Sequence, residues 1–329
     1  MAKIKAFLFL IILASVALSA LASETFVEKT IDVNGPSGIL TGYYRIPAAV
    51  NPAPIVIIVP GSGPTDHNGN SPLGINASSY LYLATGLAEA GLASIRIDKR
   101  GMFASTSAAV NPNAVTMNDY AEDLNSWINQ TTKISHNKCA WVLGHSEGAL
   151  VAEVTIKKNK NICGLILVAG AGRRMGDVLR EQLKANPANY SLLPQAFDAI
   201  QKLENGQRVD TTGLHPALNK LFRTEVQGFL ISELVLDPGE LLKNCKLPVL
   251  ILQGTNDLQI GIHDAELLKK AYPEASLEVI NGMNHVMKIV PDANKTANFE
   301  SYSDPTLPLA EKLIPIISAF IRTNSVTSK

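Results

Sequence analysis

The chain has 329 residues, of which 46% are hydrophobic and 18% charged, with 29 basic and 29 acidic side chains. This composition is typical of a globular enzyme with a sizeable core and excludes an intrinsically disordered chain. The formal net charge of zero, without a block of like charges, argues against a nucleic-acid-binding surface.

The first segment has the pattern of a secretory signal peptide. Lys3 and Lys5 precede an apolar run over 6–18, and Ala20-Leu21-Ala22 suits cleavage after Ala22. The run is shorter than the roughly 20 residues of a membrane span. We therefore expect residues 1–22 to be removed, leaving a soluble exported protein, periplasmic or secreted, without a stable membrane anchor.

Strands and helices then alternate along the chain. Residues 26–33 and 39–46 predict an antiparallel hairpin, and the β-branched run 55–59 predicts a strand buried on both faces. Further helices are expected over 78–90, 117–129, 147–158 and 309–321, and further strands over 93–97, 140–143, 165–168, 248–252 and 275–280. This alternation predicts an α/β fold with a mostly parallel central sheet and flanking helices.

The strand pattern is interrupted between residues 172 and 244. Helix-favouring segments over 177–183, 195–203 and 217–236 fill this interval, which is longer than a usual crossover connection. We interpret 173–244 as an inserted helical cap and 23–172 with 245–329 as the core. The alternative is a set of ordinary helices that cover the sheet.

The stretch Gly144-His145-Ser146-Glu147-Gly148 follows the predicted strand 140–143. A serine hydroxyl is a weak nucleophile, so nucleophilic catalysis requires it exposed on a tight strand-to-helix turn beside a base. Glycines on both sides leave room for such a turn. The stretch therefore predicts that Ser146 is a nucleophile, although five residues of this form also occur by chance.

The serine requires a histidine base and an acid that orients it. In sites built on such a turn, the acid and then the histidine follow the serine along the chain. This order selects Asp257, after the strand 248–252, and His285, after the strand 275–280. His263 follows Asp257 too closely and introduces a helix. The remaining histidines are His67, His136, His145 and His215.

A tetrahedral oxyanion requires two hydrogen-bond donors. One is expected from the backbone N–H of Glu147, directly after the nucleophile. The other is expected from the backbone N–H of Ser62 in Pro60-Gly61-Ser62-Gly63, where the chain leaves the buried strand 55–59. A simple flexible turn would also explain these glycines.

Other residues are weaker candidates. Asp66, His67, His145 and His215 are candidate substrate-pocket residues, although turns explain Asp66, His67 and His215 as well. Arg100 either braces the site through a buried ion pair or lies in a solvated loop. The Glu147 carboxylate interacts favourably with the dipole of the helix that it begins.

Three cysteines, Cys139, Cys163 and Cys245, are too few for a disulfide framework or a zinc cluster, so no metal is expected. Each lies at or just before the start of a predicted strand. Two of them could form one disulfide at the N-terminal edge of the sheet, or all could be small buried thiols.

These motifs resemble those of the α/β-hydrolase superfamily, and within it bacterial serine esterases with Pro-Gly-Ser-Gly-Pro-Thr-Asp in the oxyanion loop. The similarity spans almost the whole mature chain, through 60–66, 98–101, 144–148, 253–257 and 284–285. It implies an α/β-hydrolase fold and hydrolysis of esters, typically of short acyl chains, without a cofactor. It also overlaps serine aminopeptidases and thioesterases. His67 departs from the pattern, because arginine is expected there in the closest relatives.

The expected function is that of a carboxylesterase that cleaves a small-molecule ester through an acyl-enzyme on Ser146, with His285 as base and Asp257 as its partner. A serine aminopeptidase or thioesterase could use the same three residues. However, no acidic cluster that would hold a peptide terminus is evident in the predicted cap. A third hypothesis is an inactive hydrolase-fold binding protein.

Overall fold

The computed structural model describes residues 26–326, apart from 49, 51 and 293. The predicted signal peptide, residues 1–22, lies outside the described residues. Within them, no helix has the length and apolar character needed to cross a membrane.

The centre of the protein is an eight-stranded sheet in the order β1-β2-β6-β3-β7-β8-β9-β10. The predicted hairpin is present as β1 (Phe26–Gly35) and β2 (Gly38–Pro47), and β2 pairs antiparallel with β6 (Ala93–Ile97). From β6 onward, each strand in this order pairs in parallel with the next. The bounds of these further strands are β3 (Ile55–Val59), β7 (Ala140–His145), β8 (Ile162–Val168), β9 (Val249–Gly254) and β10 (Ser276–Ile280). The predicted mostly parallel sheet is confirmed.

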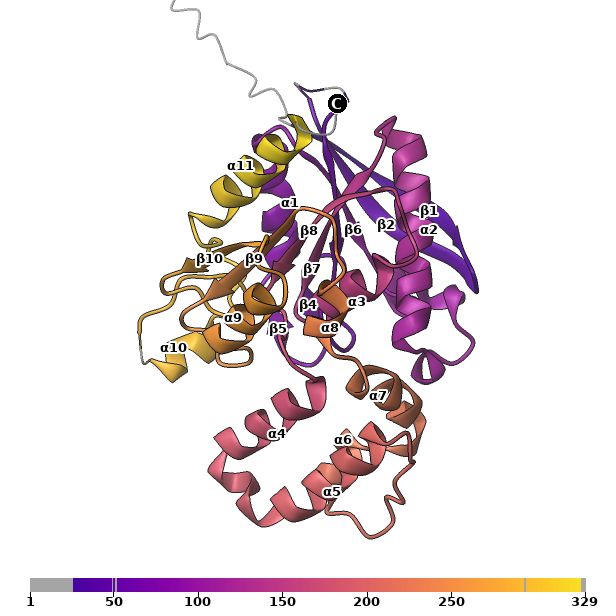
Figure 1. Cartoon of the computed structure of the whole chain (residues 1–329), viewed down its shortest axis with the longest axis vertical. Helices are drawn as coiled ribbons and strands as arrows, with labels where there is room; N and C mark the ends of the chain where they lie inside the picture. Colours follow the sequence, from indigo (N-terminus) through magenta and orange to yellow (C-terminus); the bar gives the residue numbers. More distant parts are fainter. Residues whose placement is uncertain (1–25, 49, 51, 293, 327–329) are drawn as a thin grey trace, which may run out of the picture.

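Helices cover both faces of the sheet (Figure 1). Each residue of β3 is buried, with Ile55, Ile57 and Val59 in one apolar cluster and Val56 and Ile58 in another. The first cluster packs under α2 (Met117–Ser135), α3 (Glu147–Thr155) and α9 (Ile262–Ala271), and the second under α1 (Ser79–Glu89) and α11 (Leu313–Val326). The β-branched run 55–59 is therefore buried on both faces, as predicted.

The sequence does not predict several short elements. These are the ribbon of β4 (Asn70–Ser71) and β5 (Ile75–Asn76), the 3₁₀ segments η1 (Phe103–Ala108), η2 (Pro112–Ala114) and η3 (Pro187–Leu192), and α10 (Lys295–Glu300). Short elements contain too few residues for a periodic pattern, so tertiary contacts decide them.

The interval between β8 and β9 is helical: α4 (Met175–Ala185), α5 (Leu193–Glu204), α6 (Pro216–Leu221), α7 (Gln227–Leu234) and α8 (Pro238–Leu242). We call α4 to α7 the helical insertion. It lies at one end of the molecule (Figure 1) and has an apolar cluster of its own that includes Ile200, Leu203 and Phe222. Helix α8 packs instead against α3 and α9 of the core.

The helix-favouring range 217–236 is helical over most of its length but is not one continuous helix. The structure divides this range into α6, the 3₁₀ turn η4 (Thr224–Val226) and α7. The buried Gln227 amide stabilises the break, because it donates to the carbonyl of Phe222 at 2.8 Å and exchanges hydrogen bonds with the backbone of Val209. The Gln227 side chain thus satisfies the Phe222 carbonyl, which a continuous helix would have paired with a later N–H group, and it also ties the break to Val209.

A disulfide joins Cys139 and Cys163 across the N-terminal ends of β7 and β8. Cys245 is a buried free thiol. The pairing decides between the two alternatives that the sequence leaves open for Cys139 and Cys163.

Candidate active site

Ser146 lies on a strained turn between β7 and α3. Its φ of 56° and ψ of −121° are unusual for a residue with a side chain. A Cβ on Gly144 would lie 2.2 Å from the Gly148 carbonyl oxygen, and one on Gly148 would lie 2.3 Å from that of Val59. Both flanking positions therefore require glycine, because only glycine lets the helix approach the strand ends this closely.

Asp257 and His285 meet at the same edge of the sheet. Asp257 follows β9, and its Oδ2 lies 2.8 Å from His285 Nδ1, with both side chains almost completely buried. The other carboxylate oxygen accepts the N–H groups of Gln259 and Ile260. Burial alone would raise the pKa of Asp257, but the positive charge and hydrogen bonds of His285 and these two N–H groups lower it below its usual range. Asp257 is thus held as a carboxylate beside the imidazole.

His145 connects three parts of the site. Its Nε2 lies 2.8 Å from the His285 carbonyl oxygen and its Nδ1 2.8 Å from the Tyr80 hydroxyl. Burial, followed by the charge of His285, lowers the pKa of His145 to about 3, so the ring is neutral. Nε2 must then donate to the carbonyl, and Nδ1 must accept from Tyr80. The Tyr80 hydroxyl in turn accepts the Gly61 N–H at 3.0 Å.

A buried ammonium group supports the same loop from the other side. Lys99 Nζ donates to the Gly61 carbonyl oxygen at 2.7 Å and lies 3.3 Å from Glu147 Oε1. The side chains of Lys99 and Glu147 are 4% and 2% exposed, so this ion pair is shielded from solvent. Gly61 therefore has hydrogen bonds on both its N–H and its carbonyl group.

Two cavities flank the serine turn. The smaller, about 100 Å³, is lined by Ser146 and His285 together with Tyr80, His145 and Tyr302. The larger, about 390 Å³, lies between the core and the helical insertion and is lined by Glu147 and Lys99 of the core and by mostly apolar side chains of α4 and α7. Ser62 lines both cavities.

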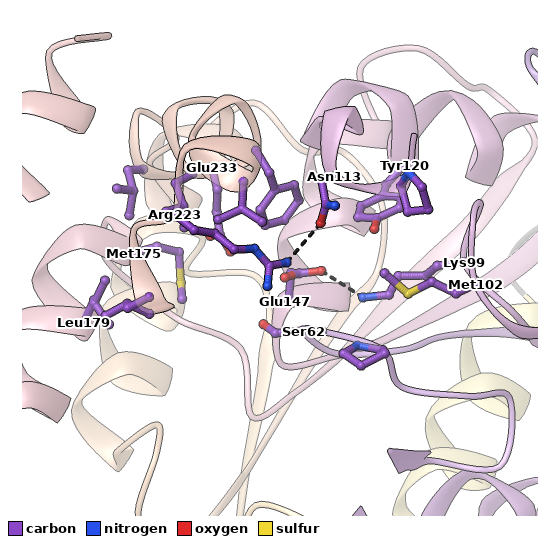
Figure 2. Close-up of a pocket in the computed structure, with 18 of the residues that line it drawn as sticks. Ser62, Lys99, Met102, Asn113, Tyr120, Glu147, Met175, Leu179, Arg223 and Glu233 are labelled. Carbon is purple, nitrogen blue, oxygen red and sulfur yellow. Dashed lines mark hydrogen bonds and ion pairs between the residues drawn. The ribbon is translucent and has the colours of Figure 1, made fainter. Parts of the chain in front are cut away.

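Figure 2 shows the larger cavity, with Ser62 and Glu147 between Met175 and Leu179 on one side and Lys99 and Met102 on the other. Glu233 of α7 also lines it. Burial and then the negative charge of Glu147 raise the pKa of Glu233 to about 8, although Lys99 partly offsets this effect.

The family model for S33 serine aminopeptidases matches residues 73–289, which span the serine turn, Asp257 and His285. The chain belongs to this family of α/β hydrolases. Esterase EstD of Thermotoga maritima is 27% identical over 270 residues, which cover 80% of this chain and 61% of that protein. The chain therefore spans less than two thirds of the length of this curated relative.

Solved structures share the fold of this S33-family hydrolase. Est1E from Butyrivibrio proteoclasticus matches with a TM-score of 0.58 and 15% identity, over 90% of this chain and 99% of that one. A thermophilic esterase from Thermogutta terrifontis matches with a TM-score of 0.54 and 18% identity, again over 90% and 99%. The α/β-hydrolase fold is confirmed.

The structure places the weaker candidate residues as follows. His145 lines the smaller cavity, but both of its ring nitrogens are engaged. Asp66, His67 and His215 line neither of the two cavities. Asp66 accepts backbone N–H groups of its own turn, His67 stacks on Tyr43 and contacts Asp98, and His215 caps α6.

Arg100 forms a buried ion pair. Its Nε lies 2.5 Å from one oxygen of Asp123 and its guanidinium also donates to the Asp119 backbone. The guanidinium therefore fixes the chain after β6 to α2. Of the two alternatives left open by the sequence, the buried pair is the one that forms.

Sequence reasoning missed Tyr80, Lys99 and Glu233. Lys99 had a usable signal, because it lies in Asp98-Lys99-Arg100-Gly101, which directly follows a buried strand. Tyr80 and Glu233 lie in ordinary helical patterns and had none. Among the described residues, no group of three or more His, Cys, Asp or Glu side chains is placed to hold a metal ion.

Proposed function

We propose that the protein is a serine carboxylesterase that hydrolyses small-molecule esters through a Ser146-His285-Asp257 triad. The buried 2.8 Å contact between Asp257 and His285, which share an edge of the sheet with the strained Ser146 turn, carries this proposal. The names of Esterase EstD and of the esterase structures that share the fold support it.

In the proposed mechanism, Ser146 Oγ attacks the ester carbonyl carbon while His285 takes the hydroxyl proton. Asp257 holds the imidazole with Nε2 facing the serine and stabilises the imidazolium that forms. The backbone N–H groups of Ser62 and Glu147 bind the oxyanion. His285 then protonates the leaving alkoxide, and a water molecule activated by the same histidine hydrolyses the acyl-enzyme.

Labelling by a fluorophosphonate probe tests the nucleophile. The wild-type protein should be labelled on Ser146 and should hydrolyse methyl butyrate. Ser146→Ala should lose labelling and reduce kcat on the order of 10⁶-fold. Labelling elsewhere, or turnover that persists in this variant, would contradict the triad.

An aminopeptidase is the second candidate, because the structure brings Glu233 of the insertion to the cavity that Glu147 lines. A substrate ammonium group in this cavity would stabilise the ionised form of Glu233, and the resulting carboxylate could bind it. Cleavage of aminoacyl anilides faster than of matched methyl esters, with a sharp loss in Glu233→Gln, would favour the peptidase. The reverse rate order favours the esterase.

We also propose that the protein is exported. The charged and apolar pattern of residues 1–22 supports this, and so does the Cys139–Cys163 disulfide, since disulfides persist mainly in oxidising compartments. Fractionation of the source cell followed by N-terminal sequencing should find a chain that begins at Ser23 outside the cytoplasm. An intact Met1 on a cytoplasmic protein would contradict export.

A further inference from the structure

The two cavities that flank the serine turn differ in size and in the chemistry of their linings, and the larger one is lined by Glu147 and Ser62 of the proposed oxyanion hole. The smaller cavity, about 100 Å³, is lined by Ser146 and His285. This volume corresponds to about three water molecules. The larger, about 390 Å³, falls in the range of small-molecule binding sites, roughly 300–1,000 Å³.

If the protein acts by the proposed function, its mechanism places the alcohol group of the ester in one cavity and the acyl group in the other. When the tetrahedral intermediate collapses, the bond from the carbonyl carbon to the alkoxy oxygen breaks, and His285 gives that oxygen its proton. The alcohol therefore leaves on the His285 side. The oxyanion lies between the N–H groups of Ser62 and Glu147. The acyl chain then takes the remaining direction at the tetrahedral carbon, away from His285 and toward the larger cavity that Ser62 and Glu147 line.

The lining of the larger cavity suits an acyl chain. Met175 and Leu179 of α4 present apolar side chains to it (Figure 2), and Phe229 and Leu230 of α7 also line it. The ionisable pair Lys99 and Glu147 lies at its core side and is already paired internally, and Arg223 donates to Asn113. Glu233 and Gln182 are further polar side chains among apolar neighbours. Most of the remaining surface can therefore bury hydrocarbon.

We infer that the preferred substrates are esters of a medium-chain or aryl-substituted acid with a small alcohol, with the acyl group bound beneath the helical insertion and the alcohol beside His285. The short acyl chains implied by the family resemblance would leave most of the larger cavity unfilled.

Two matched ester series test the assignment on the mature protein. Methyl esters from acetate to octanoate vary the acyl group, and acetates from methyl to octyl vary the alcohol, with hydrolysis followed by acid release. We expect kcat/KM to rise by about fourfold for each buried acyl methylene, and not to rise along the alcohol series. A rise along the alcohol series alone would overturn the assignment. No hydrolysis of any ester would instead contradict the proposed function.

Two cavity-filling variants test the acyl cavity and the alcohol cavity separately. Leu230→Trp should lower the octanoate-to-acetate ratio of the methyl esters at least tenfold. Ile75→Trp, which fills the smaller cavity, should keep that ratio and lower turnover of the longer alcohols. Swapped effects of the two variants would overturn the assignment.

A second inference has an independent basis in the hydrogen bonds of Lys99, and it also depends on the proposed oxyanion donors. The Gly61 carbonyl and the Ser62 N–H belong to one peptide group, and in a trans peptide they point in opposite directions. The ammonium that binds the Gly61 oxygen at 2.7 Å therefore fixes where the Ser62 N–H points. The same ammonium contacts the side chain of Glu147, whose N–H is the other donor.

We propose that Lys99 is a positioning residue that holds both oxyanion donors in place. It does not contact the oxyanion itself. A buried ammonium is effective here because charge-assisted hydrogen bonds are about twice as strong as neutral ones. It also polarises the Gly61–Ser62 peptide, which strengthens the N–H as a donor.

Lys99→Met, which keeps most of the length of the side chain and removes its charge, tests this role. We expect kcat to fall roughly 10- to 100-fold at nearly unchanged KM, since an oxyanion donor contributes mainly in the transition state. Affinity for an alkyl boronic acid, which mimics the tetrahedral intermediate, should fall by the same factor. Lys99→Arg should restore part of both.

The variant also leaves Glu147 buried without its cation, so a double variant controls for stability. Lys99→Met/Glu147→Gln removes the unpaired charge and should regain thermal stability without regaining kcat. Recovery of kcat in the double variant would overturn the proposal, as would a change in KM alone. An inactive wild-type protein would contradict the proposed function instead.

Discussion

The two ends of the parallel strands, which we call the carboxyl edge and the amino edge of the sheet, are built from different kinds of interaction. At the carboxyl edge, Ser146 has a strained backbone, and buried polar groups such as His145, Asp257 and Lys99 surround it. At the amino edge, a disulfide joins the starts of β7 and β8. One edge therefore concentrates strain and charge, and the other a covalent constraint.

This difference shows how the fold can tolerate a costly site. Non-glycine residues in sparsely populated backbone conformations cost of order 1–3 kcal/mol each, and buried charges add to this cost. Strands β3, β7 and β9 are buried along their whole length, so they hold both edges in register. Substitutions at the carboxyl edge should therefore change catalysis, and substitutions at the amino edge should change stability.

After Ser146→Ala, the largest effect is expected from Asp257→Asn. Asn Oδ1 can still accept the N–H groups of Gln259 and Ile260, but its amide would face His285 Nδ1 and favour the wrong tautomer. We expect kcat to fall on the order of 10⁴-fold with little change in Tm. Asp66→Asn is the control, because Asp66 bonds only its own turn, and its kcat should stay close to wild type. Equal losses in both variants would contradict the triad.

The double variant Cys139→Ser/Cys163→Ser tests the opposite edge. The disulfide closes a loop with a sequence separation of 24. Its loss should cost roughly 3 kcal/mol and lower Tm by roughly 6–12 °C, while kcat at 25 °C stays nearly unchanged. Calorimetry of this variant, beside reduced wild type and Cys245→Ala, checks the expectation. A large loss of kcat at temperatures where the variant is folded would break the distinction between the edges.

Tyr80→Phe should have an intermediate effect at the carboxyl edge. It removes the acceptor of the Gly61 N–H and the donor to His145 Nδ1. Loss of these bonds should lower kcat about tenfold, equivalent to about 1.4 kcal/mol. Tyr82→Phe on the same helix is the matched control, because Tyr82 bonds the Pro305 carbonyl instead. Indistinguishable kinetics for the two variants would show that the Tyr80 hydroxyl does not position the loop.

The smallest effect is expected from Glu153→Gln on α3, which begins at the carboxyl edge. Both Glu153 carboxyl oxygens are buried without a hydrogen-bond partner. Burial and then the charge of Asp237 raise the pKa of Glu153 well above its usual value. The folded state therefore holds this proton more tightly than the unfolded state, and the stability of the wild type falls as pH rises above the usual carboxyl range.

Glu153→Gln carries no such proton and should escape this loss. Its Tm should match the wild type near pH 4.5 and exceed it at pH 8 by roughly 2–4 °C, the shift expected for about 1 kcal/mol. Thermal melts of both proteins across this pH range measure the difference. A difference in Tm that does not depend on pH would contradict the buried, protonated carboxyl.

The sequence by itself predicted the parts of this protein that local pattern controls. The run 55–59, the strand 93–97 and the hairpin at the start of the chain form where expected, because alternation and β-branching are local properties. It also predicted the serine turn, since Gly144 and Gly148 are sterically required, and the order of Asp257 and His285. Their catalytic roles stay predictions.

Only the tertiary structure decided which distant groups meet. Tyr80 and His145 are 65 residues apart, Lys99 and Glu147 48, and the carbonyl bound by His145 belongs to a residue 140 positions away. It also brought Glu233 to the cavity, where the sequence had shown no acidic cluster. A hydrogen bond or a charge contact acts over a few ångströms in space and leaves no periodic pattern along the chain, so it becomes visible only once the sheet has brought the strand ends together.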